Sequence, residues 1–357
     1  MKKILIMAGG TGGHVFPGLA LADALADKQV ETVWLGTRNG MEKQWVDAAQ
    51  IPFYTISIKG LRGNGLLGWV KAPFNIFNAW RQARNIIRQE SPDLVLGMGG
   101  FVCGPGGLAA LSLKKPLVLH EQNATPGLTN RLLAPFAKKV ICAFPQTKIT
   151  GKQVEVIGNP VRRGLENLPV VQAHSPRRLL VLGGSRGALA LNEMVPKALA
   201  LLPESLRPQV IHQTGQKTLK QAQSYYQAAN VAADVVPFID DMVSAYQQAD
   251  LVISRSGALT VSELMAAARP AILVPFPFAV DDHQTTNAQA LVDINGGEIF
   301  QQADITPELL SEKIQFWMAE SQCETASKSI RASAPHSAKE KIVDVLLKLS
   351  ASPSQPS

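Results

Sequence analysis

The chain has 357 residues, of which 46% are hydrophobic and 18% are charged, a composition that excludes a disordered or low-complexity protein. This length predicts two domains. Residues 1–165 carry 20 Lys and Arg against 9 Asp and Glu, whereas the rest of the chain carries 15 against 19. The basic first half predicts an anionic partner, either a nucleic acid or a membrane surface.

Two features of the sequence bear on its compartment. The three cysteines are widely spaced and form no Cys-x-x-Cys pair, which indicates a reducing compartment and favours neither a disulfide framework nor a metal site. The uncharged run 94–113 is long enough for a membrane span, but its glycines and Pro105 favour a strand, a loop and the start of a helix. Since the first apolar run is too short for a signal peptide, we expect a soluble cytoplasmic chain.

Short apolar runs alternate with longer amphipathic stretches, which is the pattern of βαβ units and parallel sheets. The predicted strands are 3–8, 31–35, 94–96, 117–120 and 140–142 in the first half, and 178–182, 209–213, 235–238, 251–254 and 271–274 in the second. Both halves open with a strand that runs into a Gly-Gly-(Thr/Ser)-x-Gly loop, at Gly9 and at Gly183. We therefore predict two doubly wound α/β domains that face each other.

Composition also predicts the limits of the domains. The first domain is expected at residues 1–160 and the second at 161–335, with the join in a proline-rich stretch. Residues 336–349 carry apolar side chains at helical spacing, which predicts a helix that packs back on the domains. The Ser/Pro-rich residues 350–357 are expected to form a disordered tail.

The first glycine loop runs from Gly9 to His14, between the first strand and the first helix. Backbone amides at a helix N-terminus attract anions, and glycines allow a ligand to approach closely. The loop lacks the Lys-(Ser/Thr) of a P-loop, and the second strand ends in Leu35-Gly-Thr-Arg38 instead of the acidic residue that NAD needs. His14 is a candidate functional residue, the alternative being a helix-capping or packed histidine.

Similar loops follow two later strands of the first half, at residues 97–107 and at His120-Glu-Gln-Asn123. Glu121 and Asn123 have the polar groups to bind sugar hydroxyls or an N-acetyl group, and Glu121 is a candidate acid or base. The alternative for Glu121 is a solvated carboxylate at a strand end.

Candidate ligand residues in the second half also follow strands. Ser185 and its neighbouring amides are candidates for holding a pyrophosphate, an ordinary N-cap serine being the alternative. Glu263 is placed either to accept ribose hydroxyls or to form a capping box with Thr260. Gln284 and Asn287 follow the last predicted strand at its carboxyl end, where ligands bind in open α/β sheets. The chain has no Asp-x-Asp, which argues against a metal-bridged diphosphate site.

The basic excess is concentrated in residues 61–88, where a helix is predicted from about Pro73. Apolar residues lie on one face of this helix and Phe77, Arg81, Arg84 and Arg88 on the neighbouring one. With the apolar residues before it, the segment predicts a patch that contacts anionic lipid headgroups, the alternative being a core helix with a solvated basic side. A nucleic acid is disfavoured because no binding motif is present.

In this order, the loops resemble those of the MurG family, the UDP-N-acetylglucosamine-dependent transferases of peptidoglycan synthesis, over about residues 3–290. The resemblance rests on Gly9-Gly-Thr-Gly-Gly-His14, His120-Glu-Gln-Asn123, Gly158-Asn-Pro-Val-Arg162, Gly183-Gly-Ser185, Ser256-Gly-Ala-Leu-Thr-Val-Ser-Glu263 and the segment with Gln284 and Asn287. It implies a GT-B glycosyltransferase, with two Rossmann-like domains facing each other across a cleft. The implied reaction moves N-acetylglucosamine (GlcNAc) from UDP-GlcNAc to the C4 hydroxyl of N-acetylmuramic acid in the undecaprenyl-pyrophosphoryl acceptor lipid I, with inversion at C1, and gives lipid II.

The resemblance also implies roles for individual residues. His14 is the first choice for the base that takes the acceptor proton, and Glu121 is the second. The residues implied to contact the substrates are Thr11, Gly12, Gly13 and Asn123 for the GlcNAc, Ile239 and Glu263 for the uridine, and Arg162, Ser185, Asn192, Ala258, Leu259, Thr260 and Gln284 for the diphosphate or the sugar. No cofactor and no metal are implied, since amides, a helix dipole and Arg162 would stabilise the departing UDP. Three positions depart from the commonest family pattern: Phe101 replaces a Tyr, and Arg186 and His283 each replace a Gln.

Other classes of function stay open from the sequence alone. A UDP-sugar epimerase would share the two-domain fold, and a non-catalytic scaffold at a membrane surface would explain the basic patch. For the transferase, the expected partners are UDP-GlcNAc, lipid I and the anionic inner-leaflet surface, without nucleic acid. Its expected location is peripheral, on the cytoplasmic face of the cell membrane. The oligomeric state and the lipid specificity are not predicted.

Overall fold

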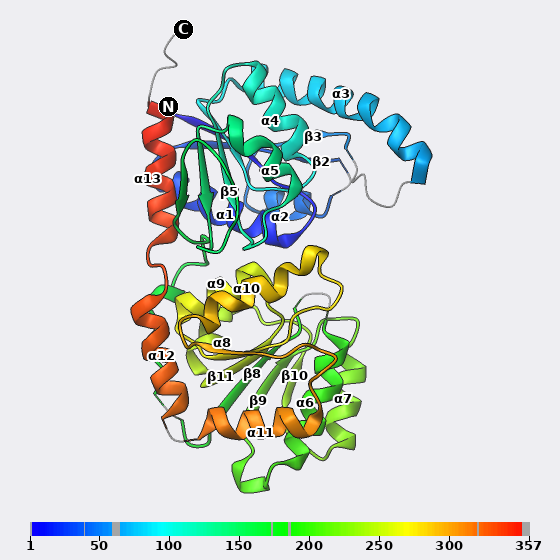
Figure 1. The fold of residues 1–357 in the computed structure, drawn as a ribbon, viewed down its shortest axis with the longest axis vertical. Coiled ribbons are helices and arrows are strands. Elements are labelled where there is room, and N and C mark those ends of the chain that lie inside the picture. The colour runs from blue at the N-terminus through cyan, green and yellow to red at the C-terminus, as the bar shows by residue number, and fades with distance from the viewer. Residues whose placement is uncertain are drawn as a thin grey trace. The chain divides into compact units, whose positions relative to one another are not determined.

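The computed structural model describes residues 2–38, 40–58, 65–172, 174–184, 187–319 and 321–351, without the side chains of residues 65–72 and 280. Backbone contacts divide the chain into unit 1, which is Met1–Val161 with Ser337–Ser357, and unit 2, which is Arg162–His336 (Figure 1). Each unit contains a wholly parallel sheet among its described residues, and each is described below by itself. The predicted α/β class with two parallel-sheet domains is therefore confirmed.

Unit 1 has a seven-stranded sheet in the order β3-β2-β1-β4-β5-β6-β7. Its strands are β1 (Lys3–Met7), β2 (Glu31–Thr37), β3 (Phe53–Ile56), β4 (Leu94–Gly97), β5 (Leu117–Glu121), β6 (Lys139–Cys142) and β7 (Val154–Val156). The five strands predicted from the sequence are present, whereas β3 and β7 were not predicted. Because β1, β4 and β5 are neighbours at the centre, the loops that follow them meet at one edge of the sheet.

Helices cover both faces of this sheet. They are α1 (Gly12–Ala26), α2 (Glu42–Ala48), α3 (Gly65–Glu90), α4 (Cys103–Ser112), α5 (Leu128–Leu133) with the 3₁₀ turn η1 (Ala134–Phe136), and α13 (Ala338–Ala351). Side chains alternate along β1, so Ile4 and Ile6 pack with α1 and α13 while Leu5 and Met7 pack with α3 and α4. A buried strand with two apolar faces is typical of a parallel sheet.

The last helix returns to the first strand of the chain. Ile342, Val343 and Leu346 of α13 are buried in the same cluster as Ile4 and Ile6. The Lys2 ammonium group donates to the Leu347 carbonyl at 3.0 Å, and Figure 1 shows α13, in red, along unit 1 beside the N-terminus. Unit 1 is therefore assembled from both ends of the sequence.

Unit 2 has a six-stranded sheet in the order β10-β9-β8-β11-β12-β13. Its strands are β8 (Arg178–Leu182), β9 (Gln209–Gln213), β10 (Asp234–Val236), β11 (Leu251–Ser254), β12 (Ala271–Leu273) and β13 (Gly297–Ile299). The helices are α6 (Leu189–Leu201), α7 (Leu219–Ala228), α8 (Met242–Gln248), α9 (Ala258–Ala267), α10 (His283–Val292), α11 (Pro307–Met318) and α12 (Gln322–Ser333), with 3₁₀ turns η2 (Leu165–Asn167), η3 (Glu204–Leu206) and η4 (Val280–Asp282). The sequence predicted all of these strands except β13.

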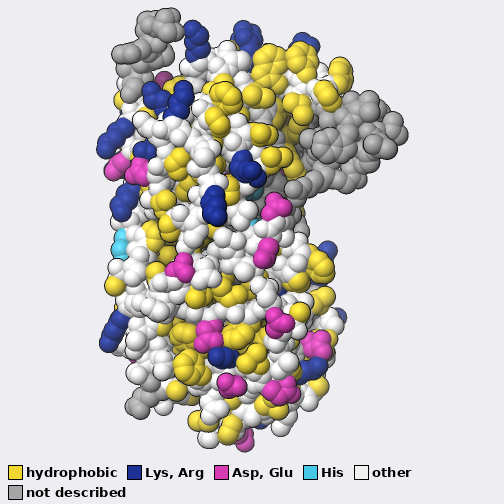
Figure 2. All heavy atoms as spheres, in the orientation of Figure 1, with side chains coloured by type: hydrophobic (Ala, Val, Ile, Leu, Met, Phe, Trp, Pro, Cys, Tyr) yellow, Lys and Arg dark blue, Asp and Glu magenta, His cyan; other side chains and the backbone are white. Residues whose placement is uncertain are grey.

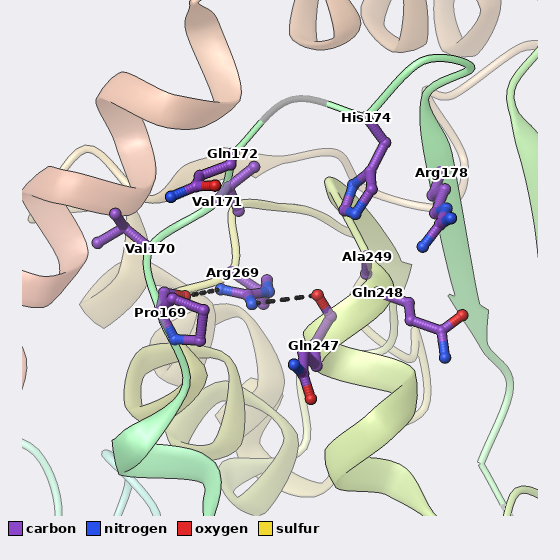
Figure 3. A pocket seen from close by; sticks show the side chains of 10 residues that line it. All are labelled: Pro169, Val170, Val171, Gln172, His174, Arg178, Gln247, Gln248, Ala249 and Arg269. Atoms are coloured by element: carbon purple, nitrogen blue, oxygen red, sulfur yellow. Dashed lines mark hydrogen bonds between the residues drawn. The ribbon is translucent and has the colours of Figure 1, made fainter.

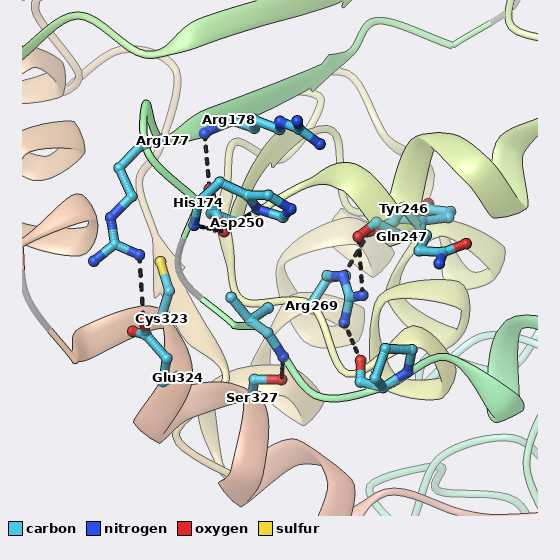
Figure 4. Close-up of polar contacts among 12 residues, drawn as sticks. His174, Arg177, Arg178, Tyr246, Gln247, Asp250, Arg269, Cys323, Glu324 and Ser327 are labelled. Atoms are coloured by element: carbon cyan, nitrogen blue, oxygen red, sulfur yellow. Dashed lines mark hydrogen bonds and ion pairs between the residues drawn. The ribbon is translucent and has the colours of Figure 1, made fainter.

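Arg269 joins several elements of unit 2 from a buried position. Its side chain is 1% exposed, and its guanidinium donates to the carbonyl oxygens of Tyr246 and Gln247 (Figure 4). It also donates to the carbonyl oxygens of Ala267, Ala268 and Pro169. Two of these carbonyls belong to the last turn of α8, and two lie where α9 ends. A cation at helix C-termini satisfies carbonyls that have no partner in the helix. Burial lowers the pKa of Arg269 to about 10, so it keeps its charge at neutral pH.

No described helix has both the length and the apolar character needed to cross a membrane. In particular, residues 94–113 form β4, a loop and α4, as predicted.

Candidate functional site

The site residues of unit 1 lie on the loops that follow β1, β4 and β5. The first two loops are in close contact: a Cβ at Gly100 would lie 2.3 Å from the Gly9 carbonyl oxygen. Gly100 and its neighbour Gly99 have φ values of +84° and +103°, a region that L side chains rarely adopt. The Cys103 thiol donates to the carbonyl of Gly99 and holds this loop against β1, and burial raises the pKa of Cys103 to about 12.

His14 is the third residue of α1, and its imidazole lies between the loops. Its Nδ1 is 2.9 Å from Oε1 of Gln122, which is buried, while the His14 side chain itself is half-buried. A Cβ at Gly99 would lie 2.9 Å from both Cε1 and Nδ1 of His14, so glycine is required for this packing. The N-cap of α1 is Thr11, not His14, which removes the helix-capping alternative.

Glu121 is buried, and backbone and side-chain donors surround its carboxylate. Oε1 accepts from the Asn123 amide at 3.0 Å, and Oε2 accepts from the Gly127 amide at 3.0 Å and from Asn130 Nδ2 at 2.9 Å. With 1% exposure it is not the solvated carboxylate of the alternative interpretation. The contacts close the loop from 121 to 127 onto β5.

The remaining predicted residues of unit 1 lie on the same edge. Thr11 is exposed, and Gly12 and Gly13 open α1, where backbone amides have no carbonyl partner within the helix. Asn123 is half-buried and follows β5, and its carbonyl accepts from the Thr147 hydroxyl.

Glu42 is a buried carboxylate under the first glycine loop that the sequence analysis missed. It accepts from the Thr37 amide at 2.7 Å and from the Thr37 hydroxyl at 2.5 Å, and more weakly from the Gly10 amide at 3.5 Å. A Cβ at Gly9 would lie 2.9 Å from its Oε1. Glu42 therefore holds the first glycine loop in place. The Gly10 amide of this loop donates to Glu42, so it points into the protein and not toward a ligand.

In unit 2, the N-terminal turn of α9 follows β11 at the carboxyl edge of the sheet. The helix starts at Ala258 with Gly257 as N-cap, so the amides of Ala258, Leu259 and Thr260 belong to the first turn. Such amides attract anions. The capping-box interpretation of Thr260 and Glu263 is wrong, because neither residue occupies the required position relative to Gly257.

Glu263 instead points to an arginine and a tyrosine. Its Oε1 accepts from Arg162 Nε at 2.7 Å, and its Oε2 accepts from the Tyr246 hydroxyl at 3.2 Å. Burial, followed by the charge of Glu263, raises the pKa of Tyr246 well above its usual range, so the hydroxyl stays a donor. The Arg162 side chain is 46% exposed and that of Glu263 is 12% exposed. The ion pair therefore lies on the solvent side of Glu263, and the buried Tyr246 lies on its inner side.

The other predicted residues of unit 2 also follow strands at this edge. Ile239 is half-buried after β10, and Gln284, in the first turn of α10, accepts from the Phe276 amide at 2.9 Å. Asn287 is buried and donates to the Ser256 carbonyl, which ties α10 to the loop before α9. Asn192 is buried in α6 and donates to the Thr214 carbonyl at 3.4 Å. The predicted Ser185 and the neighbouring Arg186 lie outside the described residues.

Unit 2 also has a pocket at the opposite edge of its sheet, with a volume of about 340 Å³ (Figure 3). It is lined by residues 169–172 and 247–249 and by His174, Arg178 and Arg269. Asp250, buried beside it, accepts from His174 Nδ1 and from the Arg178 amide, both at 2.8 Å (Figure 4). Because Arg178 begins β8, this pocket is at the amino ends of the strands and contains none of the predicted site residues.

Within the described parts of the chain, no three His, Cys, Asp or Glu side chains are grouped as ligands for a metal ion.

The chain has the two domains of glycosyltransferase family 28. The N-terminal domain of this family matches residues 4–142, in unit 1, and the C-terminal domain matches residues 178–344, mostly in unit 2. The fold and the loops thus define a glycosyltransferase, and the family confirms that the protein is an enzyme.

Individual relatives narrow this class. A protein of Hydrogenovibrio crunogenus, named UDP-N-acetylglucosamine–N-acetylmuramyl-(pentapeptide) pyrophosphoryl-undecaprenol N-acetylglucosamine transferase, is 86% identical over 98% of both chains. A protein of Alkalilimnicola ehrlichii with the same name is 50% identical over 89% of this chain and 90% of its own length. The crystal structure of Acinetobacter baumannii MurG has a TM-score of 0.83 and 41% identity, covering 98% of this chain and all of that one. The chain belongs to this family of N-acetylglucosamine transferases, the MurG family, as the loops indicated.

Proposed function

We propose that the protein transfers GlcNAc from UDP-GlcNAc to the C4 hydroxyl of N-acetylmuramic acid in lipid I, with inversion at C1, giving lipid II. The substrates are those in the names of the relatives, which favour a transferase over the epimerase and the scaffold. The observation that carries the mechanism is the position of His14: its imidazole sits at the start of α1 between two glycine loops, and only Nδ1 is bonded to Gln122.

In the proposed reaction, His14 Nε2 takes the proton of the C4 hydroxyl. The oxygen attacks C1 of GlcNAc from the side opposite the diphosphate, the new O4–C1 bond forms as the bond from C1 to the phosphate oxygen breaks, and UDP leaves with the electron pair. The GlcNAc would contact Asn123 and Thr11, and the amides of Gly12 and Gly13. A half-buried histidine suits this task because a neutral imidazole has one ring nitrogen with a free lone pair that can accept a proton.

Glu121 supports the site in a different way. Its carboxylate accepts three hydrogen bonds at 3.0 Å or less, and loss of its charge would release the loop that carries Asn123. We therefore assign Glu121 to holding the loop, and leave proton transfer to His14.

The donor is assigned to the carboxyl edge of unit 2. The Ile239 amide would bind the uracil, the first-turn amides of α9 the diphosphate, and Gln284 the sugar or diphosphate, with Ser185 and Asn192 contributing nearby. Ribose hydroxyls would donate to Glu263, which now accepts from Arg162. Because the Arg162 side chain is 46% exposed, it is free to turn from Glu263 toward the diphosphate and stabilise the leaving charge.

The lipid acceptor is proposed to be reached from an apolar and basic surface of unit 1. Exposed apolar side chains lie on α3, α4, α5 and η1, and Figure 2 shows such side chains clustered near Lys and Arg on this part of unit 1. They are Phe74, Phe77, Leu108, Leu128, Leu132 and Phe136, and the exposed cations on the same helices and the turn after α4 are Arg81, Arg88, Lys114 and Arg131. Such a surface binds anionic lipid, and we place the enzyme peripherally on the cytoplasmic face of the cell membrane.

The predicted face of α3 differs in detail from this surface. The apolar face predicted for this helix includes Trp80, Ala83 and Ile87. Ala83 and Ile87 are buried in the core of unit 1, and the partly buried Trp80 packs against it, so most of that face is covered by the protein. The exposed aromatic residues are Phe74 and Phe77, at 69% and 52%. Residues 61–64 of the predicted patch lie outside the described residues, as do the side chains of Leu66, Leu67 and Trp69.

The reaction is tested by UDP release from UDP-GlcNAc in EDTA, with and without a short-chain lipid I analogue. We expect release to require the analogue and to survive EDTA. His14→Ala should lower turnover by about 100-fold or more, the usual scale of a general base, without weakening UDP-GlcNAc binding. His336→Ala, at an exposed histidine of unit 2, is the control. Release without the analogue, or an active His14→Ala enzyme, would overturn the proposal.

The membrane surface is tested by sedimentation with vesicles of phosphatidylcholine alone or mixed with phosphatidylglycerol. We expect binding to the mixed vesicles only, and loss of it in Phe74→Ser/Phe77→Ser. Phe316→Ser, at a 47% exposed phenylalanine of α11, is the matched control. Equal binding by the two variants would assign the membrane contact elsewhere.

A further inference from the structure

A continuous series of hydrogen bonds links His14 to a backbone carbonyl of unit 1. His14 Nδ1 lies 2.9 Å from Gln122 Oε1, Gln122 Nε2 lies 2.9 Å from His120 Nδ1, and His120 Nε2 lies 3.0 Å from the Gly158 carbonyl oxygen. Gln122 and His120 are 1% and 0% exposed. The series therefore runs through the protein interior, and only the His14 end is open to solvent.

The last acceptor fixes the direction of every bond in the series. A carbonyl oxygen only accepts, so His120 Nε2 must carry the hydrogen. Burial lowers the pKa of His120 to about 4, so the ring is neutral at pH 7 and its Nδ1 is an acceptor. Gln122 Nε2 therefore donates to it, and also to the His120 carbonyl at 3.2 Å. Gln122 Oε1 is left to accept, so the hydrogen of neutral His14 lies on Nδ1.

We propose that Gln122 and His120 are positioning residues that hold His14 as the Nδ1–H tautomer, with the lone pair of Nε2 directed to the acceptor hydroxyl. This proposal rests on the proposed function for the identity of that hydroxyl. A free imidazole has two neutral tautomers, and only one of them presents an unprotonated Nε2. The series selects this tautomer with neutral groups, so it contributes orientation without placing a carboxylate beside the base.

The neighbouring contacts keep the Gln122 amide in place. The Gln122 backbone carbonyl accepts from Asn159 Nδ2 at 3.1 Å, and the His120 carbonyl accepts from Asn130 Nδ2 at 3.2 Å. Gly99 closes the other side of the His14 ring. Rotation of the Gln122 amide by half a turn would bring its NH₂ group to His14 and its oxygen to the lone pair of His120, which removes two bonds at once.

The first test reads the tautomer directly, by ¹⁵N NMR of histidine side chains in the full-length protein. In the wild type, we expect His14 to carry its hydrogen on Nδ1. Gln122→Met removes both amide groups at similar length, and should convert His14 to a mixture with Nε2–H. Gln122→Glu restores an acceptor for His14 and should restore Nδ1–H. His212 is buried in unit 2 against the Tyr226 hydroxyl, so its signals report that unit 2 is intact, and those of the buried His120 report on unit 1.

The second test separates orientation from donor binding. With a soluble lipid I analogue, Gln122→Met should lower kcat by about 10-fold or more while the KM for UDP-GlcNAc changes less than about 2-fold. Gln122→Glu should recover part of this loss. The matched control is Gln82→Met in α3, since Gln82 Oε1 also accepts a hydrogen bond, from the Ser57 amide at 2.8 Å.

The outcomes distinguish this inference from the proposed function. An inactive His14→Ala enzyme together with wild-type kcat and the Nδ1–H tautomer in Gln122→Met would overturn the positioning role and leave His14 as the base. A fully active His14→Ala enzyme would overturn the proposed function itself. An Nε2–H signal for wild-type His14 would overturn the assignment of the series whatever the kinetics.

Discussion

The absence of a side chain at Gly99 allows the His14 imidazole to occupy its position. Gly99 has φ +103°, and a Cβ there would contact the imidazole at 2.9 Å. Because the ring packs against Gly99 while its Nδ1 is bonded to Gln122, an atom added at position 99 displaces the ring from the position it holds in this hydrogen bond.

We predict that Gly99→Ala lowers kcat by about 10- to 100-fold, since a displacement of about 1 Å is enough for losses of this size. Affinity for UDP, measured by calorimetry, should stay unchanged because the residues proposed to bind UDP lie in unit 2. Gly104→Ala is the control: a Cβ there would have only Thr129 Cγ2 near it, at 3.9 Å. Equal activities of the two variants would contradict the prediction.

The sequence pointed to some residues of the candidate site and not to others, for a physical reason. His14 follows a glycine, Glu121 ends a strand, and Glu263 lies in the helix that follows a strand and a glycine turn, so their local pattern indicates a ligand site. Gln122 and Glu42 became visible only when the structure brought them against residues more than 30 positions away. A glutamine in a strand-end loop or a glutamate at a helix start has no spacing that distinguishes it from a structural residue.

At the scale of elements, polar contacts within its own unit hold α9 at its C-terminal end and at Glu263, in the middle of the helix. Its C-terminal end and the last turn of α8 share Arg269, while Glu263 and Tyr246 join the same two helices nearer the ligand edge. The geometry of the first-turn amides of α9 therefore depends on the buried guanidinium of Arg269, which lies at the opposite, amino edge of the sheet.

Arg269→Met should lower the free energy of unfolding of unit 2 by about 3 kcal/mol or more, because several buried carbonyl groups lose their donor. Urea unfolding followed by Trp317 fluorescence measures this, since the other four tryptophans lie in unit 1. Arg207 also donates to three carbonyls but is half-exposed, so Arg207→Met should cost only about 1 kcal/mol. A reversed order of the two variants would be inconsistent with this account.

The elements that the sequence missed are short. β3, β7 and β13 have three or four residues, and every residue of β7 is exposed. These strands form by pairing with a neighbouring strand of the sheet. They lack the long apolar run by which a strand is predicted from the sequence. The predicted start of α3 near Pro73 was late by about two turns, because Pro73 lies inside the helix that begins at Gly65.

At the scale of the molecule, each unit encloses one histidine in its interior. Burial lowers the pKa of His120 in unit 1 to about 4 and that of His212 in unit 2 to about 3. Since the unfolded chain protonates these groups near their ordinary pKa of about 6.5, it binds more protons than the folded chain between that value and the lowered pKa. Stability is therefore complete above pH 6.5 and falls as the pH is lowered through this window.

Lowering the pH from 7 to 5 should reduce the free energy of unfolding by about 2 kcal/mol for each of these histidines. Urea titrations at both pH values test this, with Trp317 reporting unit 2. In His212→Phe, the Trp317 transition should lose most of this pH dependence. A pH dependence as large as that of the wild type would assign the effect to other groups.

The return of α13 to unit 1 has a consequence for synthesis on the ribosome. Domains usually fold in the order in which they emerge, but Ile342, Val343 and Leu346 belong to the same core as Ile4 and Ile6. The first sheet must therefore wait, with part of one apolar face uncovered, until residues 162–336 have been translated. The second unit, continuous in sequence, can complete its own core first, so the part of the chain that is made first is the last to be finished.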